Sequence, residues 1–192
     1  MQELFSSTLI VAFAEMGDKT QLLALLLAAR FKKPVPIILA ILAATLINHG
    51  VSAALGQWIT VVIEPVWLVW ILAVGFIAMA IWMLIPDKLD DESESIRKWQ
   101  RYGVFGATFI LFFIAEIGDK TQIATVALAA KYNSILLVTL GTTIGMLIAN
   151  VPAVLIGDRF AHRLPVALIH KIGALIFLVL GLMTLVSHYY FL

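Results

Sequence analysis

The chain has 192 residues, of which 62% are hydrophobic and 13% are charged, whereas an average soluble domain has about 45–50% apolar and about 25% charged residues. The formal net charge of +1 argues against a nucleic-acid partner, and the absence of cysteine excludes disulfides, thiolate metal sites and thiol catalysis. So much apolar surface in a chain of this length indicates that lipid is its solvent.

The first predicted element is an apolar helix near the N-terminus, at residues 4–29. An acidic residue, Glu3, precedes it at a place where a signal peptide would carry positive charge. The apolar stretch also runs well past the length of a signal core. We therefore expect a retained first helix, which ends at the basic segment 30–34.

Five further apolar segments follow, and each of the six has about the 20 residues that cross a hydrocarbon core roughly 30 Å thick. Helices satisfy their backbone hydrogen bonds within one segment, as lipid requires, and the alternation typical of barrel strands is absent. The sequence predicts an all-α polytopic membrane protein with six transmembrane helices. The later five segments are residues 35–59, 66–85, 103–130, 134–156 and 166–186.

The connectors between these helices are short, except for the one in the middle of the chain. Residues 86–102 hold a run of acidic and serine residues followed by basic ones, and we interpret them as a solvated cytoplasmic linker. This linker separates a first unit of three helices, residues 1–85, from a second unit of three helices, residues 103–192.

Lysine and arginine are distributed unequally between the two sets of loops. The loops on one side carry nine of them, while the loops on the opposite side carry only Lys131. Basic loops stay in the cytoplasm, so both termini are predicted outside and the central linker inside. The nine are Arg30, Lys32, Lys33, Lys88, Arg97, Lys98, Arg101, Arg159 and Arg163.

An internal repeat relates the two units. The heptapeptide EMGDKTQ at residues 15–21 recurs as EIGDKTQ at residues 116–122, an offset of 101 residues with six of seven positions identical. The same offset pairs Gly56 with Gly157. Because each unit has an odd number of helices, the second must enter the membrane from the opposite side. The sequence thus predicts two inverted repeats, an architecture typical of secondary transporters with a site at the repeat interface near the midplane.

The repeated motif carries acidic residues into the predicted membrane interior. Burying one carboxylate there costs on the order of 3 kcal/mol on insertion scales, so these groups must be neutralised or liganded. Carboxylate, amide and hydroxyl oxygens are hard ligands that suit Mg²⁺, Ca²⁺ or Mn²⁺ rather than copper or zinc. We predict that four acids bind metal and carry the coupled protons: Glu15, Asp18, Glu116 and Asp119. Neutral ligands beside them are expected from Thr20, Gln21, Thr121 and Gln122.

Glycine and lysine complete the motif. Gly17 and Gly118 tolerate unusual backbone angles, so they can let each helix unwind and offer carbonyl groups to an ion; mid-membrane glycine is also common for close helix packing. Lys19 lies four residues after Glu15, a spacing that permits an ion pair. We expect Lys19 and Lys120 to act either as gating counter-charges that exchange with the cation or as partners that only lower the cost of burial.

Other polar residues in the apolar segments are secondary candidates. The offset aligns Asn48 with Ala149 and His49 with Asn150, and the two asparagines can extend the site or hydrogen-bond between helices. His49 is predicted to pack or to hydrogen-bond, with proton relay as the alternative. Three further histidines near helix ends are expected at the membrane interfaces: His162, His170 and His188.

Small residues mark one helix–helix contact. Gly141 and Gly145 form a GxxxG pattern, and Ala40 and Ala44 occupy the equivalent positions of the first unit. This spacing lets two helices approach closely. It does not decide whether the contact lies within one chain or between subunits.

The doubled pattern E-φ-G-D-[KR]-[ST], placed in the first helix of each unit, resembles the Gdt-type cation transporters, which include bacterial MneA-type manganese exporters. The resemblance covers nearly the whole chain. It implies a transporter and not an enzyme, with cation/proton antiport, Mn²⁺ or Ca²⁺ as cargo, no cofactor, and the four motif acids as the ion site. The short chain favours manganese export from the cytoplasm across a bacterial inner (plasma) membrane.

We hypothesise that a divalent cation displaces protons between the two motifs, after which the repeats rock to expose the site on the other side. Three alternatives stay open: an exporter of a small organic solute such as an amino acid, a passive channel, and a membrane-embedded metal-dependent enzyme. The mid-depth, symmetric acids argue against the enzyme. Proton stoichiometry, the number of bound ions and the oligomeric state do not follow from the sequence.

Overall fold

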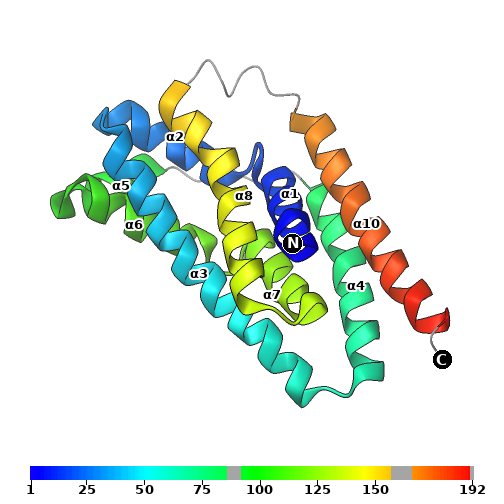
Figure 1. The fold of residues 1–192 in the computed structure, drawn as a ribbon. Helices are drawn as coiled ribbons and strands as arrows, with labels where there is room; N and C mark the ends of the chain where they lie inside the picture. The colour runs from blue at the N-terminus through cyan, green and yellow to red at the C-terminus, as the bar shows by residue number, and fades with distance from the viewer. Residues whose placement is uncertain (86–91, 157–165, 191–192) are drawn as a thin grey trace.

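The computed structural model describes residues 1–85, 92–156 and 166–190, and every regular element within these ranges is a helix (Figure 1). This confirms the all-α prediction for the described part of the chain. The first unit contains α1 (Gln2–Glu15), α2 (Lys19–Phe31), α3 (Pro34–Val62) and α4 (Pro65–Met83). The second contains α6 (Gly103–Glu116), α7 (Lys120–Tyr132), α8 (Ile135–Ile156) and α10 (Val166–Tyr190), preceded by α5 (Glu92–Trp99) and the 3₁₀ turn η1 (Gln100–Tyr102).

Each predicted helix that carries the motif is broken at the motif. The backbone leaves helical geometry after Glu15 and after Glu116, and Gly17 and Gly118 adopt φ angles of 85° and 74°. Positive φ is the region that glycine enters at little cost. The prediction that these glycines let the helix unwind is therefore confirmed. Each of the predicted helices 4–29 and 103–130 is therefore made of two shorter helices joined at the motif.

The two units repeat in structure as they do in sequence. Helices α1 and α6 begin and end 101 residues apart, as do α2 and α7. The residues that end α2 and α7, Lys32 and Asn133, both have a left-handed backbone with φ of 51°. A shared offset in helix bounds and terminal geometry shows that the two units are structural copies.

Four helices of the described chain are long and apolar enough to cross a bilayer alone, and they comprise α3, α4, α8 and Ala167–Val186 of α10. A fifth crossing is available if Ser95–Glu116 and α7, which are bent by 68° at the motif, form one broken span. The chain is therefore a polytopic membrane protein. The predicted sixth span would be made by α1 and α2, and it stays a prediction.

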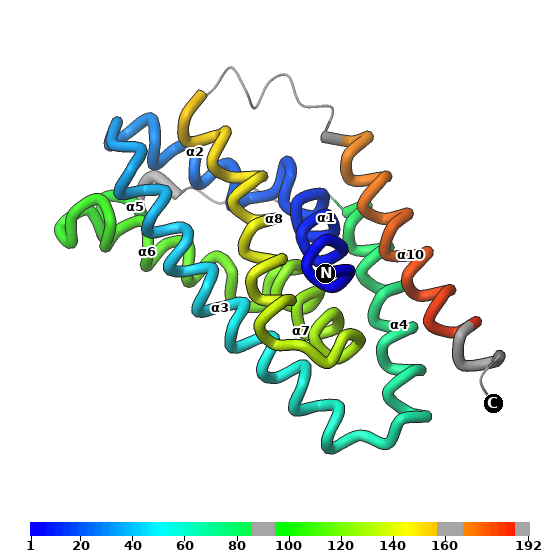
Figure 2. The backbone as a smooth tube through the Cα atoms, in the orientation of Figure 1, coloured from blue at the N-terminus to red at the C-terminus, as the bar shows by residue number. Residues whose placement is uncertain are grey.

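The units interlock, because the first helix of each unit packs against the third helix of the other unit. Helix α1 lies against α8, and α6 lies against α3 (Figure 2). A Cβ atom at Gly145 would lie 2.5 Å from the carbonyl oxygen of Thr8, and one at Gly141 would lie 2.6 Å from that of Leu4. The GxxxG stripe thus serves an intrachain contact with α1. Helices α4 and α10 lie side by side along one edge of the molecule (Figures 1 and 2).

The central linker is more structured than predicted. Helix α5 and turn η1 occupy most of it, and Ile96 is buried where α5 meets α2 and α6. Arg30 Nη2 donates a hydrogen bond of 2.9 Å to Gln100 Oε1. The predicted solvated linker therefore contains a short helix, which one buried apolar residue anchors among exposed charged ones. Residues 86–91 with Lys88, and Gly157, Arg159, His162 and Arg163, lie outside the described residues, as does the side chain of His188.

Candidate metal centre

Acidic side chains of both units meet at the helix breaks. Glu15 ends α1, Asp18 precedes α2, and Asp119 precedes α7. One carboxylate oxygen from each of these three residues lies within 4.8 Å of the other two, and all three side chains are buried. The unwound motifs thus place carboxylates from both repeats around one point, as a shared cation site requires.

The fourth motif acid, Glu116, lies at the edge of this group. It is fully buried, and the Thr121 hydroxyl that contacts it also lies 3.5 Å from Asp119 Oδ2. Glu116 Oε2 accepts a hydrogen bond of 3.2 Å from the Thr121 hydroxyl and lies 3.8 Å from Nε2 of His49. All four predicted acids therefore belong to one buried cluster, with His49 on its Glu116 side.

The motif lysines form ion pairs across the repeat interface. Lys19 Nζ lies 3.0 Å from Asp119 Oδ1, and Lys120 Nζ lies 2.9 Å from Asp18 Oδ1. The pairing of Lys19 with Glu15 that the spacing permitted is not the one that forms. That pairing assumed a continuous helix, and the break at Gly17 removes the spacing of four residues along one face.

The neutral motif residues form hydrogen bonds to the acids and to backbone groups around the helix breaks. Thr20 donates a 2.5 Å hydrogen bond to Glu15 Oε2. Gln21 and Gln122 each use Oε1 to accept the backbone N–H of the motif glycine, at 2.9 and 2.7 Å. Gln21 Nε2 also donates to the carbonyl of Ala149 in α8 at 2.6 Å. These bonds satisfy backbone groups that the helix break would otherwise leave without partners in lipid.

The two asparagine candidates differ in whether the side chain offers a buried oxygen without a hydrogen bond. Asn48 donates to the carbonyl of Phe113 at 3.2 Å, and Asn150 donates to the carbonyl of Met146 at 3.1 Å. Asn150 Oδ1 is buried and has no hydrogen-bond partner among the described residues. The side chain of Asn150 is therefore able to present an oxygen.

Sequence reasoning missed a contact of His170. It was expected at a membrane interface, but its Nε2 lies 3.1 Å from the carbonyl oxygen of Met16, in the first helix break. The offset places Val69 at the equivalent position of the first unit. Because this contact has no counterpart in the repeat, the repeat pattern could not have revealed it.

Three buried carboxylate oxygens in the cluster have no hydrogen-bond partner among the residues that the structure describes. They belong to Glu15 Oε1, Asp18 Oδ2 and Glu116 Oε1. An unsatisfied buried acceptor costs about 1–3 kcal/mol, and more if charged. Four carboxylates and two ammonium groups together carry a formal charge of −2. Oxygen acceptors with this excess charge are suited to a hard divalent cation.

Two inverted repeats that bring broken helices together at a buried acidic cluster define a membrane transporter of cations. Comparison with known proteins identifies the family. The sequence matches the family described as divalent cation/proton antiporter GDT1 over residues 3–91 and 104–190. The chain belongs to this GDT1 family, and it is a divalent cation transporter and not an enzyme.

Relatives extend across bacteria and plants. The chain is 54% identical over 186 residues to a Vibrio cholerae protein named "Putative manganese exporter", covering 96% of this chain and 90% of that protein. It is 28% identical to "GDT1-like protein sll0615" of Synechocystis, over 88% of this chain and 89% of that protein. It is 29% identical to "GDT1-like protein 3" of Arabidopsis thaliana, over 91% of this chain and 67% of that protein. No solved structure matches the chain.

Proposed function

We propose that this protein exports Mn²⁺ in exchange for protons, with Ca²⁺ as a second cargo, and that the ion binds between the two acidic motifs at the bilayer midplane. The observation that carries the proposal is the convergence of Glu15, Asp18 and Asp119, whose carboxylate oxygens lie within 4.8 Å of one another. The family description and the name of the Vibrio cholerae relative support this cargo and this exchange.

The acidic residues are the proposed ligands. Glu15, Asp18 and Asp119 supply the central oxygens, and Glu116 joins them when the ion is bound. Asn150 Oδ1 is a further neutral ligand, because it is buried without a hydrogen-bond partner in the described chain. The threonines and glutamines of the motif hold these groups and the unwound backbone in place.

The lysines act as counter-charges for the ion-free site. Each ammonium sits on the aspartate of the opposite motif at about the distance of a direct hydrogen bond. One divalent cation carries the same charge as the two ammonium groups together, so it can take the place of both Lys19 and Lys120 at Asp119 and Asp18. A monovalent cation in the same exchange would leave these oxygens one positive charge short, which favours divalent cargo.

Proton coupling follows from the charge of the cluster. A formal charge of −2 is neutralised by one divalent cation or by two protons, so the two cargoes exclude each other. Electroneutral exchange of two protons for one Mn²⁺ needs no membrane potential, whereas each uncompensated charge would couple to about 2.3 kcal/mol per 100 mV.

We place the protein in a bacterial inner membrane with six transmembrane spans. Helices α1 and α2 together form the first span, and the basic linker lies in the cytoplasm.

Transport into sealed vesicles tests the proposal. Purified protein in vesicles with an imposed pH gradient is expected to move Mn²⁺ against its own gradient, and Glu15→Gln is expected to reduce the rate at least 100-fold at unchanged protein content. Glu64→Gln, an exposed acid in the α3–α4 turn, is the matched control and should transport at the wild-type rate. Wild-type transport by Glu15→Gln would rule out the site. If the wild-type protein let Mn²⁺ leak down its gradient but did not move it uphill, the protein would instead be a channel.

A further inference from the structure

The two units carry different polar residues at one buried position of their long helices. The offset of 101 residues pairs His49 of α3 with Asn150 of α8, and both side chains are fully buried. The acids, lysines, threonines and glutamines of the motif, in contrast, are identical in the two copies. The imidazole of His49 therefore has no copy in a site whose motif residues are duplicated.

His49 lies beside the acidic cluster without a hydrogen bond of its own. Its Nε2 is 3.8 Å from Glu116 Oε2, which is too far for a hydrogen bond, and neither ring nitrogen has a hydrogen-bond partner among the described residues. Buried polar side chains nearly always have such a partner. Packing alone does not account for the imidazole, because a hydrocarbon side chain would fill this space without leaving two polar atoms unsatisfied.

The separation of His49 from Glu116 is short enough for both to bind one ion. Nitrogen ligands lie about 2.0–2.1 Å from a zinc ion, and oxygen ligands lie about 2.0–2.6 Å from Mg²⁺ or Ca²⁺. Two ligands of the same divalent ion are therefore separated by at most about 4–5 Å. The distance of 3.8 Å between His49 Nε2 and Glu116 Oε2 is below this limit.

Hydrogen bonds on either side of His49 fix this turn of α3. Asn48 Nδ2 donates to the carbonyl of Phe113 in α6 at 3.2 Å, and Ser52 Oγ donates to the carbonyl of Asn48 at 2.7 Å. The first of these bonds joins α3 to the helix that ends at Glu116. In the other unit, Asn150 Oδ1 is the buried atom without a partner in the described chain. One unit thus offers a nitrogen where the other offers an oxygen.

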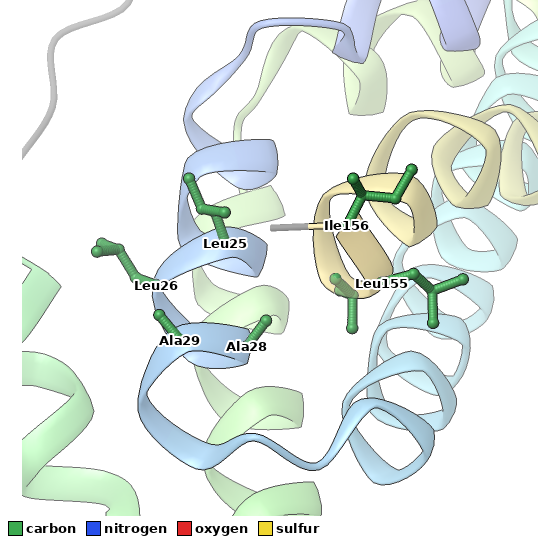
Figure 3. Close-up of a pocket in the computed structure, with 7 residues that line it drawn as sticks. Leu25, Leu26, Ala28, Ala29, Leu155 and Ile156 are labelled. Carbon is green, nitrogen blue, oxygen red and sulfur yellow. The ribbon is translucent and has the colours of Figure 1, made fainter. Parts of the chain in front are cut away.

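The cavity between α2 and the end of α8 is an unsuitable place to select a cation. It has a volume of about 390 Å³, and the side chains that line it, such as Leu25, Ala28 and Leu155, are all apolar (Figure 3). Ion pathways through membrane proteins are marked by polar or ionisable side chains. Discrimination between cations therefore belongs to the buried cluster.

We propose that His49 is a nitrogen ligand of the transported cation and determines the preference for Mn²⁺ over Ca²⁺ and Mg²⁺. This inference rests on the proposed function and identifies the residue that selects its cargo. Ca²⁺ and Mg²⁺ take oxygen ligands, whereas first-row transition ions also accept imidazole nitrogen. Mn²⁺ in addition suits carboxylate oxygens. The nitrogen discriminates against Ca²⁺ and Mg²⁺ but not against Fe²⁺.

Electron spin-echo spectroscopy tests the ligand directly, because Mn²⁺ is paramagnetic. The protein is labelled with ¹⁵N at histidine only, purified in detergent and loaded with Mn²⁺. A ¹⁵N hyperfine coupling is expected in the wild-type protein and in His170→Gln, the matched histidine control, and it should be absent from His49→Asn. Wild-type protein that binds Mn²⁺ without a ¹⁵N coupling would overturn the inference, whatever the variants do.

Competition between ions measures the effect on selectivity. His49→Asn gives the first unit the residue that the second unit already has, so the site offers oxygen ligands alone. The excess of Ca²⁺ that releases half of the bound Mn²⁺ should fall by about 10–100-fold, the range typical of altered metal ligation. An unchanged excess would contradict the proposal. If His49→Asn binds neither ion, His49→Gln is measured in its place.

The proposed function is tested separately by Mn²⁺ uptake of the wild-type protein in vesicles. Failure of that uptake would refute manganese transport and this inference with it. Wild-type uptake of Mn²⁺ together with an unchanged Ca²⁺ excess in the His49 variant would refute the role of His49 alone.

Discussion

The two copies of the motif share six of seven residues but lie in different surroundings. The pair of Asp18 with Lys120 is buried completely, each side chain being 1% exposed, whereas Lys19 in the matching pair with Asp119 is 37% exposed. Duplication therefore fixes which residues make up the site, whereas the surrounding helices determine how accessible each copy is. A transporter needs this combination, because its site must be constant while its access changes sides.

The backbone of the two breaks differs in the opposite sense to the lysines. Helix α10 packs on α1, and His170 contacts the carbonyl of Met16 in the first break. In the second break, Ile117 is 60% exposed, and α4 packs instead on α7. The break is thus more covered in the first unit, whereas the lysine that follows it is more buried in the second.

The largest expected effect of this asymmetry is on the two lysines. Lys120→Met leaves Asp18 buried without its counter-charge, a change that costs about 3–5 kcal/mol of stability for a buried pair. Lys19→Met also strands a buried carboxylate, Asp119, but Lys19 is the more exposed partner, so a smaller loss of stability is expected than for Lys120→Met. Denaturant unfolding in detergent micelles, without divalent cation, measures both values.

Addition of Mn²⁺ sharpens this comparison. The cation replaces the missing ammonium at Asp18, so it should restore stability to Lys120→Met, by about 2.7 kcal/mol at a concentration 100 times the dissociation constant. Sodium at the same ionic strength is the control and should restore little. Equal destabilisation of the two lysine variants would show that the exposure difference between the pairs has no energetic meaning.

Sequence reasoning predicted which acidic residues converge but not how they pair with the lysines. The offset of 101 residues was sufficient to predict that Glu15, Asp18 and Asp119 converge, because inverted repeats bring equivalent points together at the midplane. The partner of Lys19 was missed, because helical spacing was extended across Gly17, where the chain leaves the helix. Helix α5 was missed because a single buried apolar residue, Ile96, gives no periodic pattern among its charged neighbours.

The contact of α1 with α8 provides a second, smaller test of the difference between units. Gly145→Ala would place a Cβ atom 2.5 Å from the carbonyl oxygen of Thr8, and overpacking of this kind costs about 1–3 kcal/mol. The first unit already has Ala44 at the equivalent position, so its α3–α6 contact tolerates the methyl group. Unfolding measurements should therefore show a loss for Gly145→Ala. Gly75→Ala, where a Cβ would meet nothing within 4 Å, should show none.

The smallest expected effect belongs to His170, which has no counterpart in the first unit. His170→Leu removes the hydrogen bond to Met16, and a typical bond of this kind contributes about 0.5–1.5 kcal/mol. His170→Gln retains a side-chain donor and should keep most of that stability. If the contact only packs α10 onto α1, both variants should transport Mn²⁺ at the wild-type rate once folded. If it also restrains the first break, His170→Leu should change the transport rate while His170→Gln does not, because only the leucine frees the Met16 carbonyl.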